Sequence, residues 1–154
     1  MNRRRWMAAL PALALAARAG AQAARDPLAG LTPEQRRAVQ AFLKGKSRPG
    51  EGDAAADDAI AADLDGDGKP ELTVRWTFFG PTFAYSGLAV FSAAAGGWRL
   101  AGESPLTGIV DRMSLEGRVI RVDAKTLGKN DPRCCPTKAI VERFRWAGGK
   151  LAKG

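Results

Sequence analysis

Apolar and polar residues alternate along much of the chain after residue 55, and this alternation predicts β-strands. The clearest run extends from Leu72 to Phe78, in which every second residue is large and apolar. Gly-rich turns separate the shorter runs, so we expect neighbouring strands to pair antiparallel. The predicted strands cover residues 56–64, 72–78, 85–93, 98–100, 109–115, 118–123, 138–146 and 150–151.

A single helix is predicted before the strands. Thr32, Pro33 and Gln35 form a helix start with a capping box. The apolar residues between 39 and 43 form a stripe along one side, and Gly45 is the predicted stop. Because so short a helix is marginal by itself, we expect it to cover a sheet.

These elements predict a mainly β (α+β) fold, with one antiparallel sheet or half-barrel covered by the N-terminal helix. Residues 24–53 are assigned to the helix and its linker, with a flexible lead over residues 24–30. Residues 54–154 are assigned to the antiparallel β part, and the two parts together to one globular domain.

The first 23 residues have the layout of a secretory signal peptide. Arginines at positions 3–5 precede an apolar stretch over residues 6–17, and small residues at 21 and 23 suit cleavage. The apolar stretch is too short to anchor the chain in a bilayer. A cytosolic amphipathic helix is the alternative. Export predicts a periplasmic or secreted protein with no stable membrane anchor after cleavage.

Charge and composition narrow the classes of function. Removal of residues 1–23 takes away four arginines and no acid, so the net charge falls from +8 to +4. The remaining cations are scattered, which argues against nucleic-acid binding. The absence of histidine from the sequence excludes His-based triads and His-ligated metals.

An acidic stretch follows the first predicted strand. Carboxylates occupy positions 1, 3, 5 and 9 of a loop with glycine at position 6, an arrangement that suits a hard, oxygen-seeking cation such as Ca²⁺. Gly66 and Gly68 permit the positive φ angles that tight winding needs. The predicted ligands are the side chains of Asp63, Asp65, Asp67 and Glu71 and the carbonyl of Lys69.

This loop differs from an EF-hand, because Val74 stands at position 12 and the flanks are strand-like. Residues 61–72 instead resemble the calcium loops of FG-GAP and VCBS-type repeats, with the form D-x-[DN]-x-D-G-x-x-D-[LI], although Glu71 replaces the final Asp. The resemblance implies a structural calcium site between two strands. One copy does not imply a propeller, and a metal-free acidic hairpin turn is the alternative.

The two cysteines are neighbours, Cys134 and Cys135, in the segment Asn-Asp-Pro-Arg-Cys-Cys-Pro. In an exported protein we expect thiols to be oxidised. A vicinal disulfide that stiffens the loop, intermolecular pairing and two free thiols all remain open.

Residues 131–136, with the strand and Gly-Gly turn that follow, resemble the C-terminal pattern of LppP/LprE-type envelope lipoproteins. That family has no established molecular function, so the resemblance implies an envelope location and no catalytic residue. This chain lacks the lipidation cysteine of those proteins.

Aromatic residues gather between positions 76 and 85. If Trp76 and Phe78 face the core, Phe79 points the other way. Phe79, Phe83 and Tyr85 are therefore the residues predicted to line a candidate ligand groove. A core that extends over both faces of the sheet is the alternative.

The preferred functional hypothesis is a non-enzymatic, calcium-stabilised binding or envelope-associated module, with an unknown protein or envelope ligand. A small thiol-active or hydrolytic enzyme and an inhibitor of a cell-wall-directed enzyme are the alternatives. A pocket that joins Cys134 and Cys135 to convergent polar groups would favour the enzyme. An apolar groove without such a cluster would favour the binding module.

Overall fold

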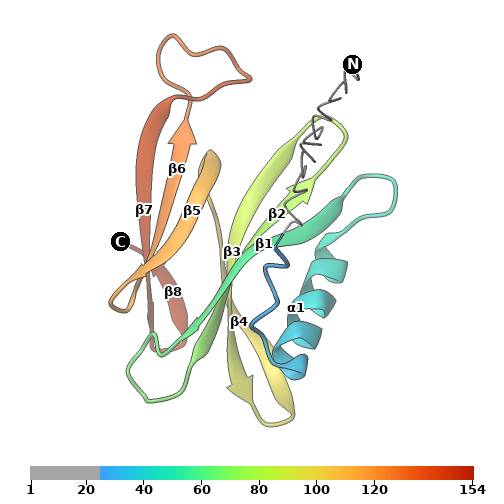
Figure 1. Ribbon diagram of the computed structural model, residues 1–154, viewed down its shortest axis with the longest axis vertical. Helices are drawn as coiled ribbons and strands as arrows, with labels where there is room; N and C mark the ends of the chain where they lie inside the picture. The colour runs from blue at the N-terminus through green and yellow to red at the C-terminus, as the bar shows by residue number, and fades with distance from the viewer. Residues whose placement is uncertain (1–24) are drawn as a thin grey trace, which may run out of the picture.

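The computed structural model describes residues 25–154 and contains one helix and eight strands (Figure 1). The mainly β class with a single helix is confirmed. The predicted signal peptide lies outside the described residues, and no helix within them has the length and hydropathy needed to cross a membrane. The elements are α1 (Pro33–Lys46), β1 (Asp53–Ala62), β2 (Glu71–Phe79), β3 (Ala84–Ala94), β4 (Gly97–Pro105), β5 (Ile109–Glu116), β6 (Val119–Thr126), β7 (Lys138–Ala147) and β8 (Lys150–Lys153).

Helix α1 begins as predicted and ends later than predicted. The Thr32 hydroxyl accepts a hydrogen bond from the Gln35 N–H at 3.2 Å, and the Thr32 N–H donates to the Gln35 side chain at 2.9 Å. The predicted capping box is therefore confirmed. The helix continues through Gly45, and extended Ser47 ends it by donating its N–H to the Leu43 carbonyl at 2.9 Å.

The segment before the helix packs against it, contrary to the predicted flexible lead. Leu28 is buried beside α1, in the cluster that also contains Val39. Arg36 of the helix donates to the Leu28 carbonyl at 2.6 Å and to the Asp26 carboxylate at 2.9 Å. The segment before α1 therefore belongs to the layer that covers the first sheet.

The strands form two antiparallel sheets of four, where the sequence predicted one sheet or half-barrel. In both sheets the spatial order follows the chain, β1-β2-β3-β4 and β5-β6-β7-β8. The chain leaves the first sheet after Pro105 and starts the second at Ile109. The alternation of residues predicts each strand, but it does not say at which turn one sheet ends and the next begins.

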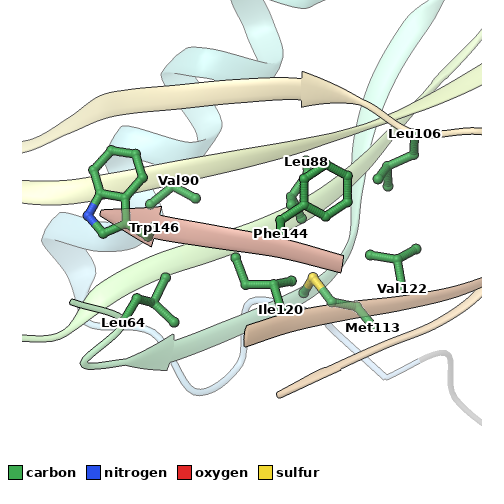
Figure 2. Close-up of a cluster of buried hydrophobic side chains, with 9 residues drawn as sticks. All are labelled: Leu64, Leu88, Val90, Leu106, Met113, Ile120, Val122, Phe144 and Trp146. Carbon is green, nitrogen blue, oxygen red and sulfur yellow. The ribbon is translucent and has the colours of Figure 1, made fainter. Parts of the chain in front are cut away.

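The first sheet is covered on both faces. Helix α1 lies over one face, where it packs on apolar residues of β1, β2 and β3 (Figure 1). The second sheet packs over the other face, and side chains from both sheets meet in a core between them (Figure 2). That core consists of Leu64, Leu88, Val90, Leu106, Met113, Ile120, Val122, Phe144 and Trp146.

Leu64 belongs to this core although it lies in the loop after β1. The sequence predicted a strand through Leu64, but β1 ends at Ala62. The Leu64 side chain still reaches the space between the sheets and is buried there (Figure 2). The β1–β2 loop is thus anchored at its start by an apolar contact.

A buried carboxylate on β7 holds the connection between the two sheets. Glu142 is 5% exposed, and it accepts hydrogen bonds from the Thr107 N–H at 2.9 Å and the Thr107 hydroxyl at 2.7 Å. Lys153 also donates to it. Burial alone would raise the pKa of Glu142, but the hydrogen bonds from Lys153 and Thr107 outweigh it, so the pKa lies below its usual value.

Replacing Glu142 with Gln should lower the free energy of unfolding by about 1–3 kcal/mol, because a buried charged acceptor is lost. Since the folded-state pKa is lowered, the carboxylate stabilises the fold above its unfolded pKa, and this contribution disappears as the pH falls through the folded value. Urea denaturation at several pH values measures the difference, which should shrink in acid. Glu51→Gln, at an exposed glutamate, is the control. An equal loss of unfolding free energy in both variants would contradict the stabilising role of the Glu142 carboxylate.

Candidate functional site

The predicted metal ligands lie in the loop that joins β1 to β2, at one end of the first sheet (Figure 1). Gly66 has a φ of 88° and Gly68 a φ of 84°, the left-handed conformation that the sequence predicted. A side chain at Gly66 would also overlap the guanidinium of Arg118, which lies against the loop from the β5–β6 turn. Because the exposed Arg118 side chain can move aside, it is the backbone conformation that favours glycine at position 66.

The aspartates wind the loop around their own carboxylates. Asp63 accepts hydrogen bonds from the N–H groups of Gly66 at 2.6 Å and Gly68 at 3.1 Å, one on each oxygen. Asp65 and Asp67 each accept one from the N–H two residues further on, at 3.1 and 2.7 Å. Because a carboxylate oxygen has more than one lone pair, these bonds leave capacity for a cation.

Three of the predicted side-chain ligands come together. Carboxylate oxygens of Asp63, Asp65 and Glu71 all lie within 4.8 Å of one another. Asp67 is not part of this cluster, and its carboxylate accepts the N–H of Lys69. The participation of Asp67 and of the Lys69 carbonyl stays a prediction.

Glu71 is the unusual member of the cluster, because it is 5% exposed at the start of β2. Its carboxylate accepts the Leu64 N–H at 2.9 Å and so joins the two ends of the loop. Burial raises the pKa of Glu71, and the negative charges of Asp65, Asp67 and Asp63 raise it further, against the opposing bond from Leu64. A bound cation would offset both effects.

The cysteine segment lies in the β6–β7 loop of the second sheet, at the end of the molecule opposite the acidic loop (Figure 1). The structure joins the exposed Cys134 and Cys135 by a disulfide bond. Asp131 closes the base of this loop, because its carboxylate accepts the N–H groups of Gly128 at 2.7 Å and Thr137 at 2.6 Å. These backbone bonds and one from the Thr137 hydroxyl hold the pKa of Asp131 below its usual value.

The three residues of the predicted aromatic groove do not share one surface. Phe83 and Tyr85 stack with Phe78, with ring centroids 5.8 and 5.2 Å from it, on the face that carries α1. Phe79 points to the other side, as the alternation predicted, and borders a separate hollow beside residues 48–53. The grouping of Phe79 with Phe83 and Tyr85 is therefore wrong, because adjacent strand residues face opposite sides.

Tyr85 borders a hollow of about 320 Å³ at the end of α1. The ammonium of Lys46 stands at this hollow, 5.2 Å from the centroid of the Trp76 ring and 2.7 Å from the carboxylate of Glu103. The charges of this site are thus already paired within the chain.

A second hollow beside Tyr85 lies where the two sheets separate, and the sequence did not predict it. It has a volume of about 350 Å³ and draws on three distant segments, the start of β3, the connection between the sheets and the β6–β7 loop. Its lining includes the exposed apolar residues Ile109 and Leu127, and their apolar character is its one signal in the sequence. Its lining residues are Ala84, Tyr85, Ser86, Leu106, Gly108, Ile109, Lys125, Thr126, Leu127, Arg133 and Pro136.

Comparisons of the chain with family models, with curated proteins and with solved structures found no match. A functional interpretation therefore depends on the acidic loop, the cysteine loop and the hollow between the sheets.

Replacing Asp131 with Ala should speed hydrogen exchange at the Gly128 and Thr137 amides, because both lose their acceptor. NMR-detected exchange measures the effect, and Asp111→Ala on β5 is the control. In the native protein the Asp131 carboxylate should order this loop at pH values above the usual aspartate pKa. The loop should lose this order as the pH falls through the lowered pKa of Asp131. Unchanged exchange at both amides in Asp131→Ala would contradict the role of this carboxylate in ordering the loop.

The mass of the denatured mature protein should rise by two hydrogen atoms on reduction, because the structure joins Cys134 to Cys135. Intact-mass spectrometry with and without reductant makes the measurement. A dimer that separates on reduction would show intermolecular pairing, and an unchanged monomer mass would show free thiols.

Proposed function

We propose that this protein is an exported, calcium-stabilised binding module of the cell envelope, without catalytic chemistry of its own. The hollow between the sheets is the observation that favours binding over catalysis. Among the described residues, its lining consists of apolar residues together with Ser86, Lys125, Thr126 and Arg133, and it includes neither cysteine. A hollow with a mixed polar and apolar lining can hold a ligand, and this one does not bring the disulfide to convergent polar groups.

Ser86, the one serine of that hollow, lacks the partner that a nucleophile needs. Its hydroxyl lies 2.8 Å from the Thr77 hydroxyl. Thr77 uses its single proton on the carboxylate of Asp57, at 2.6 Å, so Ser86 is the donor in the bond to Thr77. A threonine hydroxyl is not a base, and the arrangement does not activate Ser86 for hydrolysis.

The acidic loop supports the calcium part of the proposal. Three carboxylates with oxygens within 4.8 Å of one another repel, and the burial of Glu71 adds to the cost. Ca²⁺ accepts six to eight oxygen ligands and tolerates irregular geometry, so carboxylates and water can complete its shell. Because Glu71 begins β2 and Leu64 lies in the inter-sheet core, the ion would stabilise the fold and have a structural role.

The location rests on the sequence. Residues 1–23 have the layout of a signal peptide, and an oxidising, calcium-rich exterior suits both a disulfide and a weak calcium site. The resemblance of residues 131–136 to envelope lipoproteins points to the same compartment.

Calcium should stabilise the mature protein by about 2.7 kcal/mol at a concentration one hundred times its dissociation constant. Thermal unfolding in calcium and in EDTA measures this shift, and calorimetric titration measures binding. Asp65→Ala should lose both responses, because one of the three clustered ligands is removed. Asp111→Asn, an exposed acid outside the loop, should keep them, and equal binding heats in the two variants would contradict the site.

Glu71→Gln separates loss of the ion from loss of the fold. A glutamine oxygen can still accept the Leu64 N–H, while the repulsion from the aspartates is removed. This variant should therefore melt higher than the native protein in EDTA and show no calcium response. A variant that melts lower than the native protein in EDTA would contradict the repulsion between Glu71 and the loop aspartates.

A further inference from the structure

The hollow of about 320 Å³ at the end of α1 lies on the helix-covered face of the first sheet, and we call it the α1 hollow. The indole of Trp76 lies across Gly87, its register partner on β3, so that a side chain at position 87 would collide with it. The α1 hollow thus depends on glycine at this position. Its lining residues are Lys46, Trp76, Tyr85, Ser86, Gly87, Glu103 and Pro105.

An exposed aromatic ring borders the α1 hollow. Tyr85 is 47% exposed, and its ring packs edge to face with the Trp76 indole, with 5.9 Å between the centroids. Phe83, 54% exposed, lies nearly parallel to Tyr85, with an angle of 5° between the planes and 6.4 Å between the centroids. The aromatic surface therefore continues outward from the hollow over a second exposed ring.

The indole of Trp76 carries a polar atom without a partner. Its Nε1 is buried, and within the described part of the chain it makes no hydrogen bond. The indole edge that carries Nε1 lies against Gly87, which also lines the α1 hollow. Because buried polar groups are nearly always hydrogen-bonded, an unpaired N–H beside a hollow indicates a place where an external acceptor is expected.

A closed ion pair supplies the charged groups of the lining. The ammonium of Lys46 lies 2.7 and 2.9 Å from the two carboxylate oxygens of Glu103, and both side chains are about one-third exposed. The two charges cancel, so a charged ligand gains little from the hollow. The ammonium has a third proton and the carboxylate has further lone pairs, so the pair still offers a donor and an acceptor side by side.

A ligand that complements these groups is uncharged, has an apolar side and carries adjacent hydroxyl groups. A sugar ring has these properties, because its C–H groups pack on an aromatic face and its neighbouring hydroxyls both donate and accept. A polyproline peptide also packs on aromatic rings. Proline lacks an N–H, however, so such a peptide would place carbonyl oxygens against the Glu103 carboxylate.

We propose that the α1 hollow binds one unit of a neutral oligosaccharide, with the sugar ring against Tyr85, its hydroxyls at Lys46 and Glu103, and the next unit over Phe83. The cancelled charge and the two exposed rings determine this ligand class. The inference goes beyond the function proposed above, since it depends neither on calcium nor on the hollow between the sheets.

NMR titration of the ¹⁵N-labelled mature protein in EDTA, with cellotriose, tri-N-acetylchitotriose and trigalacturonate, tests the proposal. At least one of the two neutral trisaccharides should shift the Nε1–H resonance of Trp76. The Nε1–H resonances of Trp98 and Trp146, which lie outside the lining, should not move. Trigalacturonate should bind more weakly than the neutral ligand. Tighter binding of this anion, or equal shifts at all three tryptophans, would overturn the proposal.

Variants of the exposed rings locate the contact. Tyr85→Ala should weaken binding of the neutral trisaccharide roughly fivefold, the scale of one aromatic contact. Tyr85→Phe retains the ring and should bind as the native protein does. Phe79→Ala removes a similarly exposed ring from the other face of the sheet and should have no effect. Equal losses in Tyr85→Ala and Phe79→Ala would overturn the assigned site.

Glu103→Gln tests the role of the paired charges. It frees the Lys46 ammonium, so the affinity for trigalacturonate should rise roughly fivefold, the scale of one exposed charge contact, while the affinity for the neutral trisaccharide falls. Glu51→Gln, at an exposed glutamate before β1, should change neither affinity. A purely structural role of Glu103 would lower both affinities together, and that result would overturn the assigned recognition.

Two further results distinguish the possible failures. Absence of binding of both neutral trisaccharides, in a protein that calcium still stabilises, would overturn this inference and leave the proposed function standing. A proline-rich decapeptide is the remaining probe. A shift at Trp76 with this peptide and with neither neutral trisaccharide would overturn the proposal in favour of a polyproline-binding groove.

Discussion

The β1–β4 sheet has to bury both of its faces, and the rest of the molecule is arranged around that requirement. Strand β2 is buried along almost its whole length. Helix α1 covers the side with Leu72, Val74, Trp76 and Phe78, and a single short helix has no second surface to offer. The other face is therefore covered by a second sheet, whose connecting segment is held by the buried carboxylate of Glu142.

The packing of the two sheets differs along their length, and this separates the two candidate sites. At one end Leu64 reaches the shared core and Glu71 closes the acidic loop, so an ion there would act on the fold itself. At the other end the sheets diverge, and the core opens into the hollow near Tyr85. The candidate ion site and the hollow are therefore at opposite ends of the packed sheets.

The cysteine loop lies at the open end, but its disulfide does not line the hollow. Arg133 and Pro136 contribute to its lining, while Cys134 and Cys135 lie outside it. A disulfide and the carboxylate of Asp131 both restrict the same short loop. Restriction of a loop that presents a charged side chain lowers the ordering cost of binding.

Local chemistry in the chain was sufficient to predict the capping box at Thr32, the strand from Leu72 to Phe78 and the left-handed conformation of Gly66. Each depends on a few neighbouring residues or on a period of two. The division into two sheets, the burial of Glu71 and the hollow beside Ile109 depend on segments far apart in the chain. Only tertiary packing decides them, because alternation shows that a face is buried and does not show what covers it.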